Sequence, residues 1–572
     1  MCPISGQILS CMCARRTDIN IERRALIRAP IGFASLYVSG CRRLDSIEGG
    51  FTGTTPERGH LLREAWAEKP PDITRTVHTL IASGGIAGLA AARALRLDGH
   101  DDFALLELED HAGGNSRGGA VLGIACPLGA HYLPVPGDDA RAVQDFLEEL
   151  GLRRRVAGRW VYDERHLCHS PQERLFFHGQ WQDGLLPVQG VNAATLTQYR
   201  RFAQAVGAAQ RAARYAIPVQ KSGFAPVQLA QDAMTFKAWL AAEGFSDPQL
   251  LWYLDYCCRD DFGGGIGTVS AWAGLHYFAS RHGFHAPEPG AGMGEREADA
   301  GVLTWPQGNG WLSERLAAPL GDRLHTGRVV HRIEPGRHGV TVDALDVASG
   351  RRERWQARQC VVALPVHVAA RVVQPLPAAL RERAATLRSA PWLVANLRLR
   401  APLNDRPGAA PSWDNVLYGS AGLGYVDAMH QSLAPVPGPT VLTWYHALGD
   451  VPGGRELLLQ RPWSHWRDAV LAELGAAHPD LAAKTLRIDI TRYGHAMAVP
   501  VPGVLDQVRL QRTSIQRKQL SKSEYSDALI WPVAPQLAFA HSDWSGYSVF
   551  EEAFTLGHAA GAAIAARRQA VV

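Results

Sequence analysis

The sequence contains no pair of CxxC motifs and no regular cysteine framework. Its nine cysteines are scattered over 572 residues. A zinc ribbon needs two closely spaced cysteine pairs, and a disulfide-stapled domain needs a dense framework, so both classes are excluded and no metal site is expected. The adjacent Cys257 and Cys258 are predicted to be packing residues, because thiols in an aromatic context behave as small hydrophobic groups.

A strong excess of charge of one sign is also absent. The 59 basic and 55 acidic residues give a net charge of +4, and the basic residues are spread along the chain. Proteins that bind nucleic acid need a clustered basic surface, so no nucleic-acid partner is expected. The hydrophobic share of 46% suits a soluble globular protein. The length favours two domains, or one cofactor domain with a large insertion.

A hydrophobic run long enough to span a membrane is missing near the N-terminus. The apolar stretch 29–38 is much shorter than the roughly 20 residues that a membrane-spanning helix needs. It follows Arg23 and Arg24, and an arginine pair ahead of a short apolar core resembles a twin-arginine export signal. The sequence Val-Ser-Gly-Cys ending at Cys41 resembles a lipoprotein box, in which Cys41 becomes the lipidated residue.

These signals predict a leader over residues 1–41 and a linker over 42–72. The protein is then expected to be exported, periplasmic or lipid-anchored to the membrane surface through Cys41. The alternative is a disordered basic tail on a cytoplasmic protein. Translation starting at Met12 is a further possibility.

The segment that follows predicts a strand, a glycine turn and a helix. Residues 77–82 are apolar and partly β-branched, residues 83–88 read Ser-Gly-Gly-Ile-Ala-Gly, and residues 89–95 are strong helix formers. In such a turn the backbone approaches a pyrophosphate, which the helix N-terminus attracts. Gly85 and Gly88 stand where that approach and close helix packing leave no room for a side chain.

The turn departs from the GxGxxG pattern at one position, because Ser83 replaces the first glycine. A second strand over residues 103–106 ends at Glu107, whose carboxylate is suited to ribose hydroxyl groups. Glu107 follows Gly88 by 19 residues, close to the expected spacing of about 20. The predicted cofactor residues of this unit are Ser83, Gly84, Gly85, Gly88 and Glu107.

Residues 107–115, Glu-Leu-Glu-Asp-His-Ala-Gly-Gly-Asn, resemble the second phosphate segment of the flavin-containing amine oxidase superfamily. That superfamily includes monoamine oxidases, phytoene desaturases and protoporphyrinogen oxidases. Its paired glycines are usually followed by arginine, whereas Gly113 and Gly114 precede Asn115 here, with Arg117 nearby as a substitute. The resemblance implies FAD as the cofactor, since the first turn alone does not distinguish FAD from NAD.

Residues 536–557 resemble the closing motif of the same superfamily, with His541 where a glycine is usual. There a strand and the following helix approach the flavin cofactor. The resemblance implies that Asp543 lies near the ribitol or phosphate groups and that Glu551, at the start of the helix, also contributes to cofactor binding.

Within that motif, Trp544 to Tyr547 is similar to a tetrapeptide of monoamine oxidases whose tyrosine helps to form an aromatic cage over the flavin. Tyr547 and Trp544 are therefore candidate catalytic residues. The alternative is that Tyr547 packs in the core, as most buried aromatic residues do.

Residues 305–312 resemble the loop that re-enters the FAD domain, and strands are expected at 328–333 and 359–365. In the first of these strands Val330 occupies the position of a backbone contact to the adenine. The expected fold class is α/β, with a Rossmann-like FAD-binding domain of the GxGxxG type and an interleaved α+β substrate domain. The FAD-binding domain is expected to comprise 73–160, 300–370 and 500–572. The substrate domain is expected to comprise 161–299 and 371–499.

The expected substrate domain is rich in aromatic residues, which suits an apolar or amphipathic pocket as well as plain core. His131 and His495 are candidates for substrate contact or proton handling, because histidine titrates near neutrality. Asp260 and Asp261 suggest a pair of carboxylates, but acidic residues that precede a run of glycines usually cap a helix or form a turn.

One lysine is missing by comparison with monoamine oxidases, in which a substrate-domain strand carries it to the flavin. The comparable strand 392–398 offers Ala395 or Asn396 instead. This absence argues against efficient oxygen-driven amine oxidation.

The sequence therefore predicts an FAD-dependent oxidoreductase that removes a hydride from a C–H bond next to nitrogen of a small or amphipathic substrate. The electron acceptor is left open between oxygen and a quinone. One alternative is a desaturase or isomerase of an isoprenoid or lipid-like substrate, and another is a non-catalytic FAD-binding structural protein. Residues 507–526 are predicted to be a surface insertion.

Overall fold

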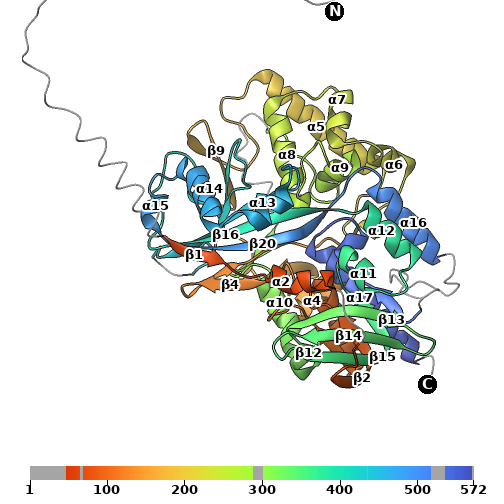
Figure 1. The fold of residues 1–572 in the computed structure, drawn as a ribbon. Coiled ribbons are helices and arrows are strands. Elements are labelled where there is room, and N and C mark those ends of the chain that lie inside the picture. The colour runs from red at the N-terminus through yellow and green to blue at the C-terminus, as the bar shows by residue number, and fades with distance from the viewer. Residues whose placement is uncertain (1–46, 65–68, 288–300, 434–435, 517–534, 570–572) are drawn as a thin grey trace, which may run out of the picture. The chain divides into compact units, whose positions relative to one another are not determined.

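The structure is a computed structural model (Figure 1), and residues 47–572 form one compact unit. The residues it describes are 47–64, 69–287, 301–433, 436–516 and 535–569. The predicted leader and Cys41 lie outside these ranges. Within them, no helix has both the length and the apolar character needed to cross a membrane.

A seven-stranded sheet is assembled from segments far apart in the sequence. Its strands run in the order β12, β3, β2, β15, β14 and β13, and β21 also pairs with β15. The pairs among β12, β3, β2, β15 and β21 are parallel, whereas β14 is antiparallel to both of its neighbours. The strand bounds are Ile73–Ala82 (β2), Phe103–Leu106 (β3), Leu324–His325 (β12), Arg328–Pro335 (β13), Val340–Asp346 (β14), Arg352–Val362 (β15) and Leu537–Phe539 (β21).

Both faces of this sheet are buried, which explains the apolar run at the end of β2. Ile81 belongs to the core under the first set of helices, and its neighbour Leu80 belongs to the core on the opposite face, because strand side chains alternate. The first set comprises α3 (Ile86–Leu97), α4 (Arg141–Glu149), α10 (Gly310–Ala317) and α17 (Phe550–Gln569). The opposite core includes residues of α11 (Val366–Val372) and α12 (Ala378–Thr386). The predicted α/β, Rossmann-like arrangement is confirmed.

An eight-stranded sheet forms the second large layer, with the order β1, β20, β16, β19, β18, β17, β9 and β10. Helices α5 to α9 share a core with it. The strand bounds are Glu48–Phe51 (β1), Glu173–Phe177 (β9), Gln180–Asp183 (β10), Arg388–Leu399 (β16), Asp414–Leu417 (β17), Tyr425–Asp427 (β18), Thr440–Ala447 (β19) and Thr485–Val499 (β20). The helix bounds are Ala193–Ala212 (α5), Pro226–Asp232 (α6), Phe236–Ala242 (α7), Pro248–Phe262 (α8) and Ala271–Ala279 (α9).

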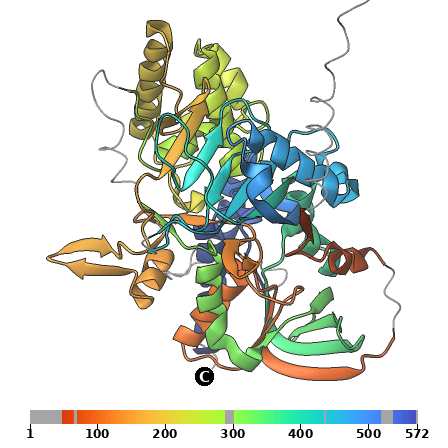
Figure 2. The ribbon, with the colours of Figure 1, turned by 90° about the vertical axis from the view of Figure 1, so that its left-hand side faces the viewer.

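Short elements complete the fold, and one hairpin, β7–β8, projects from the body (Figure 2). The remaining strands are Gly118–Val121 (β4), Ile124–Pro127 (β5), Tyr132–Pro134 (β6), Arg153–Val156 (β7), Arg159–Tyr162 (β8) and Val302–Thr304 (β11). The remaining helices are Pro56–His60 (α2), Gly454–Gln460 (α13), Trp463–Gly475 (α14), Leu481–Lys484 (α15) and Val504–Gln516 (α16). The 3-10 helices include Leu61–Arg63 (η1), Val219–Lys221 (η2), Ala318–Arg323 (η5) and Ser542–Trp544 (η6).

Two sequence-based predictions need correction. Residues 48–51, within the predicted linker, form β1, which pairs in parallel with the edge of β20. The first part of the predicted insertion belongs to α16, where Val508 is buried in the core that α5 to α9 share. Both segments lack a strong local signal, and partners distant in the sequence determine their structure.

Helices α3 and α17 pack with their backbones in close approach. A Cβ atom added to Gly557 of α17 would lie 2.0 Å from the carbonyl oxygen of Ala87 in α3. One turn later, a Cβ at Gly561 would lie 2.4 Å from the carbonyl oxygen of Ala91. These positions therefore exclude any side chain, and the small-residue composition of both helices follows from their contact.

We expect Gly557→Ala to lower the free energy of unfolding by about 1–3 kcal/mol, because the added methyl group overlaps a carbonyl and the helices must separate. Gly475→Ala is the matched control, since no atom lies within 4 Å of a Cβ at this end of α14. The control should be neutral or stabilising by up to about 1 kcal/mol. Chemical denaturation of both variants checks this, and an equal effect of the two would contradict it.

Candidate functional site

The first glycine turn joins the end of β2 to the start of α3. Ser83 adopts φ +95°, a conformation that glycine tolerates and other residues rarely adopt. Its N–H donates to the Leu106 carbonyl at 2.9 Å, which ties the turn to β3. A Cβ at Gly88 would lie 1.9 Å from the Ser83 carbonyl oxygen. The turn thus keeps the geometry of the glycine pattern although serine stands first.

Glu107 holds this turn from the end of β3. Its carboxylate accepts the N–H of Gly84 at 2.7 Å and the N–H of Glu109 at 2.9 Å, and the residue is 6% exposed. Burial raises the pKa of Glu107, and the two backbone N–H groups oppose that rise. Each carboxylate oxygen retains a second lone pair for a hydroxyl group.

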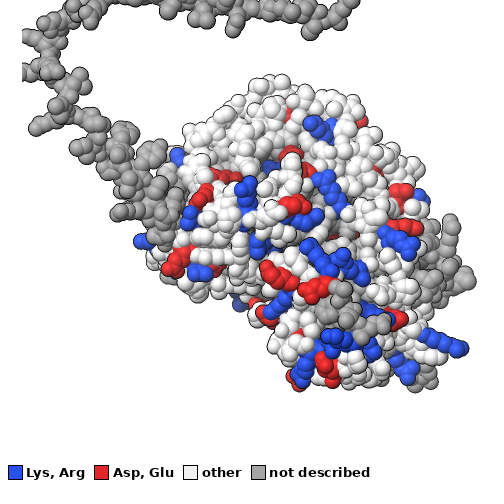
Figure 3. All heavy atoms as spheres, viewed as in Figure 1, with Lys and Arg blue, Asp and Glu red and all other residues white. Residues whose placement is uncertain are grey.

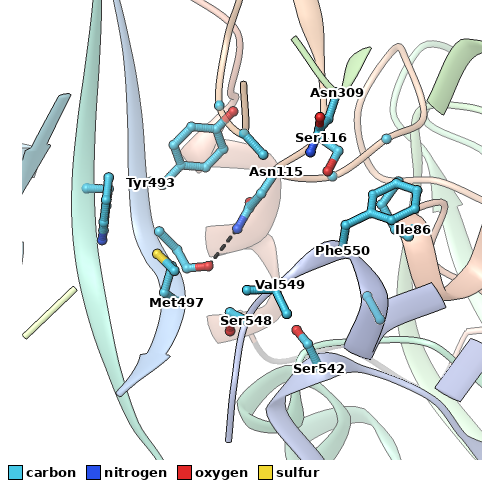
Figure 4. A pocket seen from close by; sticks show the side chains of 18 of the residues that line it. Ile86, Asn115, Ser116, Asn309, Tyr493, Met497, Ser542, Ser548, Val549 and Phe550 are labelled. Carbon is cyan, nitrogen blue, oxygen red and sulfur yellow. Dashed lines mark hydrogen bonds between the residues drawn. The ribbon is translucent and has the colours of Figure 1, made fainter. Parts of the chain in front are cut away.

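A cavity opens beside the turn. Strands β16, β19 and β20 of the eight-stranded sheet and the segments that follow β2, β15 and β21 of the seven-stranded sheet contribute to its wall. Ile86 of α3 and Phe550 of α17 lie beside each other on one side, and Tyr493 and Met497 of β20 lie on the other (Figure 4). The Asn115 side chain reaches across between them and donates to the Ala496 carbonyl at 2.6 Å, the dashed line in Figure 4.

The predicted site residues divide into two groups. Those on the cavity wall are Ser83, Gly85, Gly113, Gly114, Asn115, His131, His495 and Glu551. Those that do not line it are Gly84, Gly88, Glu107, Arg117, Val330, Asp543, Trp544 and Tyr547.

Several members of the second group support the wall from behind. Arg117 donates to the Gly114 carbonyl at 2.9 Å and so braces the second glycine segment. Asp543 is 6% exposed and accepts the Val366 N–H at 2.9 Å, so its carboxylate links η6 to the start of α11. Val330 is buried in β13, next to a register shift in its pairing with β14.

The aromatic-cage interpretation of Trp544 and Tyr547 is not supported by their positions. Trp544 is 1% exposed and packs on Phe539, with ring centroids 5.7 Å apart. Tyr547 is 2% exposed, packs on Phe262 at 5.3 Å, and donates its hydroxyl to Asp261 at 2.6 Å. Both rings are therefore core residues, the alternative that sequence reasoning left open for Tyr547.

The two candidate histidines lie on the wall but do not titrate near neutrality. Burial lowers the pKa of His131 to about 3, and its ring stacks on Tyr445 with centroids 4.5 Å apart. Burial and then the neighbouring His367 lower the pKa of His495 to about 3. His495 also contacts the Ser389 hydroxyl at 2.8 Å. Both imidazoles are uncharged at neutral pH, which removes the proton-handling argument made from the sequence.

Sequence reasoning missed a charged group on the wall. Asp260 and Asp261 lie in the last turn of α8, not in a cap or a loop, and both line the cavity with Arg281. Arg281 forms an ion pair with Asp261 at 3.0 Å and also donates to the Tyr547 hydroxyl. No local pattern marks Arg281, because only the packing of α9 beside α8 brings it to Asp261.

Strand β16 presents Trp392 and Val394 to the cavity. Ala395 does not line it, and Asn396 is fully buried, with its amide donating to the Pro127 carbonyl at 3.1 Å. No lysine lines the cavity as far as the structure describes the chain. Trp392 and Val394 therefore face the cavity, in place of the Ala395 or Asn396 proposed from the sequence.

These residues fit a dinucleotide cofactor. A Cβ at Gly85 would meet no atom closer than 3.8 Å, so the turn is open on that side. Gly85 is the N-cap of α3 without a side-chain cap, and a helix N-terminus of this kind attracts phosphate. Gly113 and Gly114 have φ +125° and +58°, which brings a second stretch of backbone to the same wall.

A model of the flavin-containing amine oxidoreductases matches residues 86–565. The chain belongs to this family. It is an FAD-dependent oxidoreductase, which sets aside a non-catalytic structural role, and FAD is its cofactor. No curated protein sequence matches this family member significantly. Among the described residues, no group of histidine, cysteine or acidic side chains is arranged to hold a metal ion.

Solved structures of similar fold include two amine oxidases. Wild-type putrescine oxidase bound to putrescine has 16% identity and a TM-score of 0.62, covering 87% of this chain and all of that one. Cyclohexylamine oxidase from Brevibacterium oxydans has 19% identity and a TM-score of 0.60, with the same coverage. A fatty acid isomerase from P. acnes has 14% identity and a TM-score of 0.54, covering 84% of this chain and 97% of that one. At these identities the likeness establishes the fold alone.

We expect Glu107→Gln to raise the dissociation constant for FAD at least tenfold. The glutamine amide has one acceptor oxygen, whereas the Glu107 carboxylate accepts hydrogen bonds from two backbone N–H groups, so one of these bonds is lost. A charge-assisted hydrogen bond is worth about 1.5–3 kcal/mol. Fluorescence titration of the FAD-free protein with FAD measures the change. Glu334→Gln is the matched control, because the Glu334 side chain is 46% exposed and pairs with Arg332 on the same strand. Unchanged affinity in Glu107→Gln would contradict the assignment.

A pH dependence of stability follows from Asp260. Burial, and then the charge of Asp261, raise the pKa of Asp260 to about 7. The folded protein therefore binds more protons than the unfolded chain between about pH 4 and pH 7, so the free energy of unfolding falls as the pH rises through this interval. We expect Asp260→Asn to reduce the loss between pH 5 and pH 8 by about 1–3 kcal/mol. Urea denaturation at each pH provides the measurement, and parallel pH profiles for wild type and variant would refute it.

Proposed function

We propose that this oxidoreductase removes a hydride from a carbon bonded to nitrogen in a small or amphipathic amine. The observation that supports this best is the charge of the cavity wall, where Asp260 lies unpaired and the positive charge of Arg281 is neutralised by Asp261. A cationic amine is attracted to such a wall, whereas an anionic substrate is repelled. FAD supplies the two-electron chemistry when bound.

The protein's own contribution is positioning and exclusion of water. The side chains of Trp392 and Tyr445 line the cavity, and the Tyr445 hydroxyl donates to the Gly129 carbonyl at 3.0 Å, which fixes its ring. The neutral rings of His131 and His495 add polar atoms without charge. Hydride loss needs an uncharged nitrogen, so an amine that is attracted as a cation first releases its proton to water and then reacts as the neutral amine.

Glu551 begins α17 on the same wall and is 4% exposed. Burial raises the pKa of Glu551 to about 7. Its position at a helix N-terminus favours negative charge, so we propose that it orients the cofactor side of the cavity by accepting hydrogen bonds. Gly85, Gly113 and Gly114 would then hold the phosphate groups through backbone contacts.

One observation favours a second candidate function, the desaturation or isomerisation of a lipid-like substrate. No lysine lines the described cavity, and the wall has a large apolar share that includes Ile86, Met497 and Phe550. The fold likeness to a fatty acid isomerase agrees with this candidate. A carboxylate-bearing lipid would need an available cation, however, and Arg281 is held by Asp261.

From the sequence we also propose an electron acceptor and a membrane surface as partners. Oxygen or a quinone would reoxidise the enzyme, and export with anchoring through Cys41 would place it at a membrane surface. On the face drawn in Figure 3, basic and acidic side chains are intermixed.

Anaerobic mixing of the holoenzyme with candidate substrates tests the proposed function. We expect loss of flavin absorbance near 450 nm (about the isoalloxazine band) with primary amines, and none with unsaturated fatty acids or polyenes. Bleaching by the lipid-like compounds alone would support the second candidate instead. Oxygen consumption against reduction of a soluble quinone, measured with whichever substrate reacts, then identifies the acceptor.

A further inference from the structure

The cavity wall carries more negative than positive side chains. Asp260, Asp261 and Glu551 line it, and Arg281 is the single lysine or arginine among its described lining residues. Arg281 pairs with Asp261, 3.0 Å away, and donates to Tyr547. The remaining carboxyl groups on the wall are not matched by any cation on that wall.

The histidines on the wall do not supply the missing charge. Burial holds the pKa of both His131 and His495 near 3, so neither ring is protonated at neutral pH. His541 also lines the cavity, but it lies 3.3 Å from Asp543, which does not line it. Its charge, when present, is compensated there.

Asp260 is the carboxyl group with the least compensation. Within the described ranges it forms no hydrogen bond or ion pair, although it lies on the wall and is partly buried. Burial, and then the charge of Asp260, raise the pKa of Asp414 in β17, so the two carboxyl groups lie near each other. After burial, the charges of Asp260 and Asp414 also raise the pKa of Tyr132 and of Tyr256. Two like charges in a desolvated place are costly unless a cation joins them.

Aromatic rings surround the same place. Tyr132 lies on the wall and meets Trp413 edge-on, with centroids 5.8 Å apart, and Trp413 directly precedes Asp414. The centroid of the His131 ring lies 5.4 Å from that of Trp413 and 4.5 Å from that of Tyr445. The negative faces of such rings attract an ammonium group, which adds to the effect of the carboxylates.

In the proposed reaction, an ammonium group bound by these carboxylates cannot contain the reacting nitrogen. Loss of a hydride from the carbon is assisted by the lone pair of the adjacent nitrogen, and a protonated nitrogen has no lone pair. We propose that Asp260 binds a second ammonium group that stays protonated during the reaction. The substrate class is then a diamine or longer polyamine. This inference rests on the proposed function.

Binding of amidinium probes to the oxidised holoenzyme tests the inference without turnover. The nitrogen-bearing carbons of butanediamidine and butanamidine carry no hydrogen, so neither probe can lose a hydride there. Titration calorimetry should show that the dication butanediamidine binds at least tenfold more tightly than the monocation butanamidine. Butanoate, the anionic probe, should bind most weakly.

Substitutions locate the charged subsite. Asp260→Asn should weaken binding of the dication by roughly 10- to 100-fold and change that of the monocation less than about threefold, as expected for loss of one charge-assisted contact. Asp414→Asn should give a smaller loss in the same direction. Asp145→Asn is the matched control, because the Asp145 side chain is 54% exposed on α4 and pairs with Arg141 at 3.7 Å; it should change neither affinity.

Equal affinity of wild type for the two amidines would overturn the inference, and this comparison needs no variant to fold. Tighter binding of butanoate would overturn it in favour of a carboxylate-bearing substrate at Arg281. Anaerobic flavin bleaching by butylamine and 1,4-diaminobutane distinguishes failure of the second ammonium site from failure of the proposed amine oxidation. Bleaching by both amines without an amidine preference refutes only the second ammonium site, whereas bleaching by neither refutes the proposed function.

Discussion

The close contact of α3 with α17 is the constraint on which the site depends. These helices come from opposite ends of the described chain, and glycine at 557 and 561 lets their backbones approach where any side chain would overlap a carbonyl group. Both helices begin at the cavity wall, α3 with Ile86 and α17 with Phe550 and Glu551. If the helices moved apart, the two helix N-termini that line the cavity would no longer meet there.

The glycine turns depend on this contact in turn. Gly88 presses on the carbonyl of Ser83, and Ser83 keeps a positive φ because β3, α3 and Glu107 hold the turn from three sides. A strained serine is tolerated here since the surrounding structure determines its conformation. The substitution that weakened the motif in the sequence therefore leaves its geometry unchanged.

Burial decides the charge of the substrate side. It keeps His131 and His495 neutral, and it raises the pKa of Asp260 and Glu551 toward neutrality. A wall of this kind carries carboxyl groups whose ionisation responds to the ligand: a bound cation favours the ionised form, and an apolar ligand favours the protonated form. Selectivity for charge thus follows from desolvation as much as from residue type.

The sequence by itself determined the cofactor unit, because its signals are local. The run from Val77 to Asn115 and the small-residue helix after Phe550 each specify their own backbone through glycine, chain propensity and apolar pattern. The resemblance of these segments named the family that the comparison then confirmed. Strands β2, β3 and β13 and helix α3 could be placed to within a few residues for the same reason, whereas β15 begins well before the predicted residue 359, at Arg352.

Only the tertiary structure decided which side chains meet around the cavity. Asp261, Arg281 and Tyr547 meet although they are far apart in the chain, and no local pattern distinguishes them from surface charges or core aromatics. Likewise, the packing of β16 turned Trp392 and Val394, not Asn396, toward the cavity. Glycine turns report a backbone requirement that is visible locally, whereas the function of a buried charge depends on which groups, distant in sequence, share its low-dielectric surroundings.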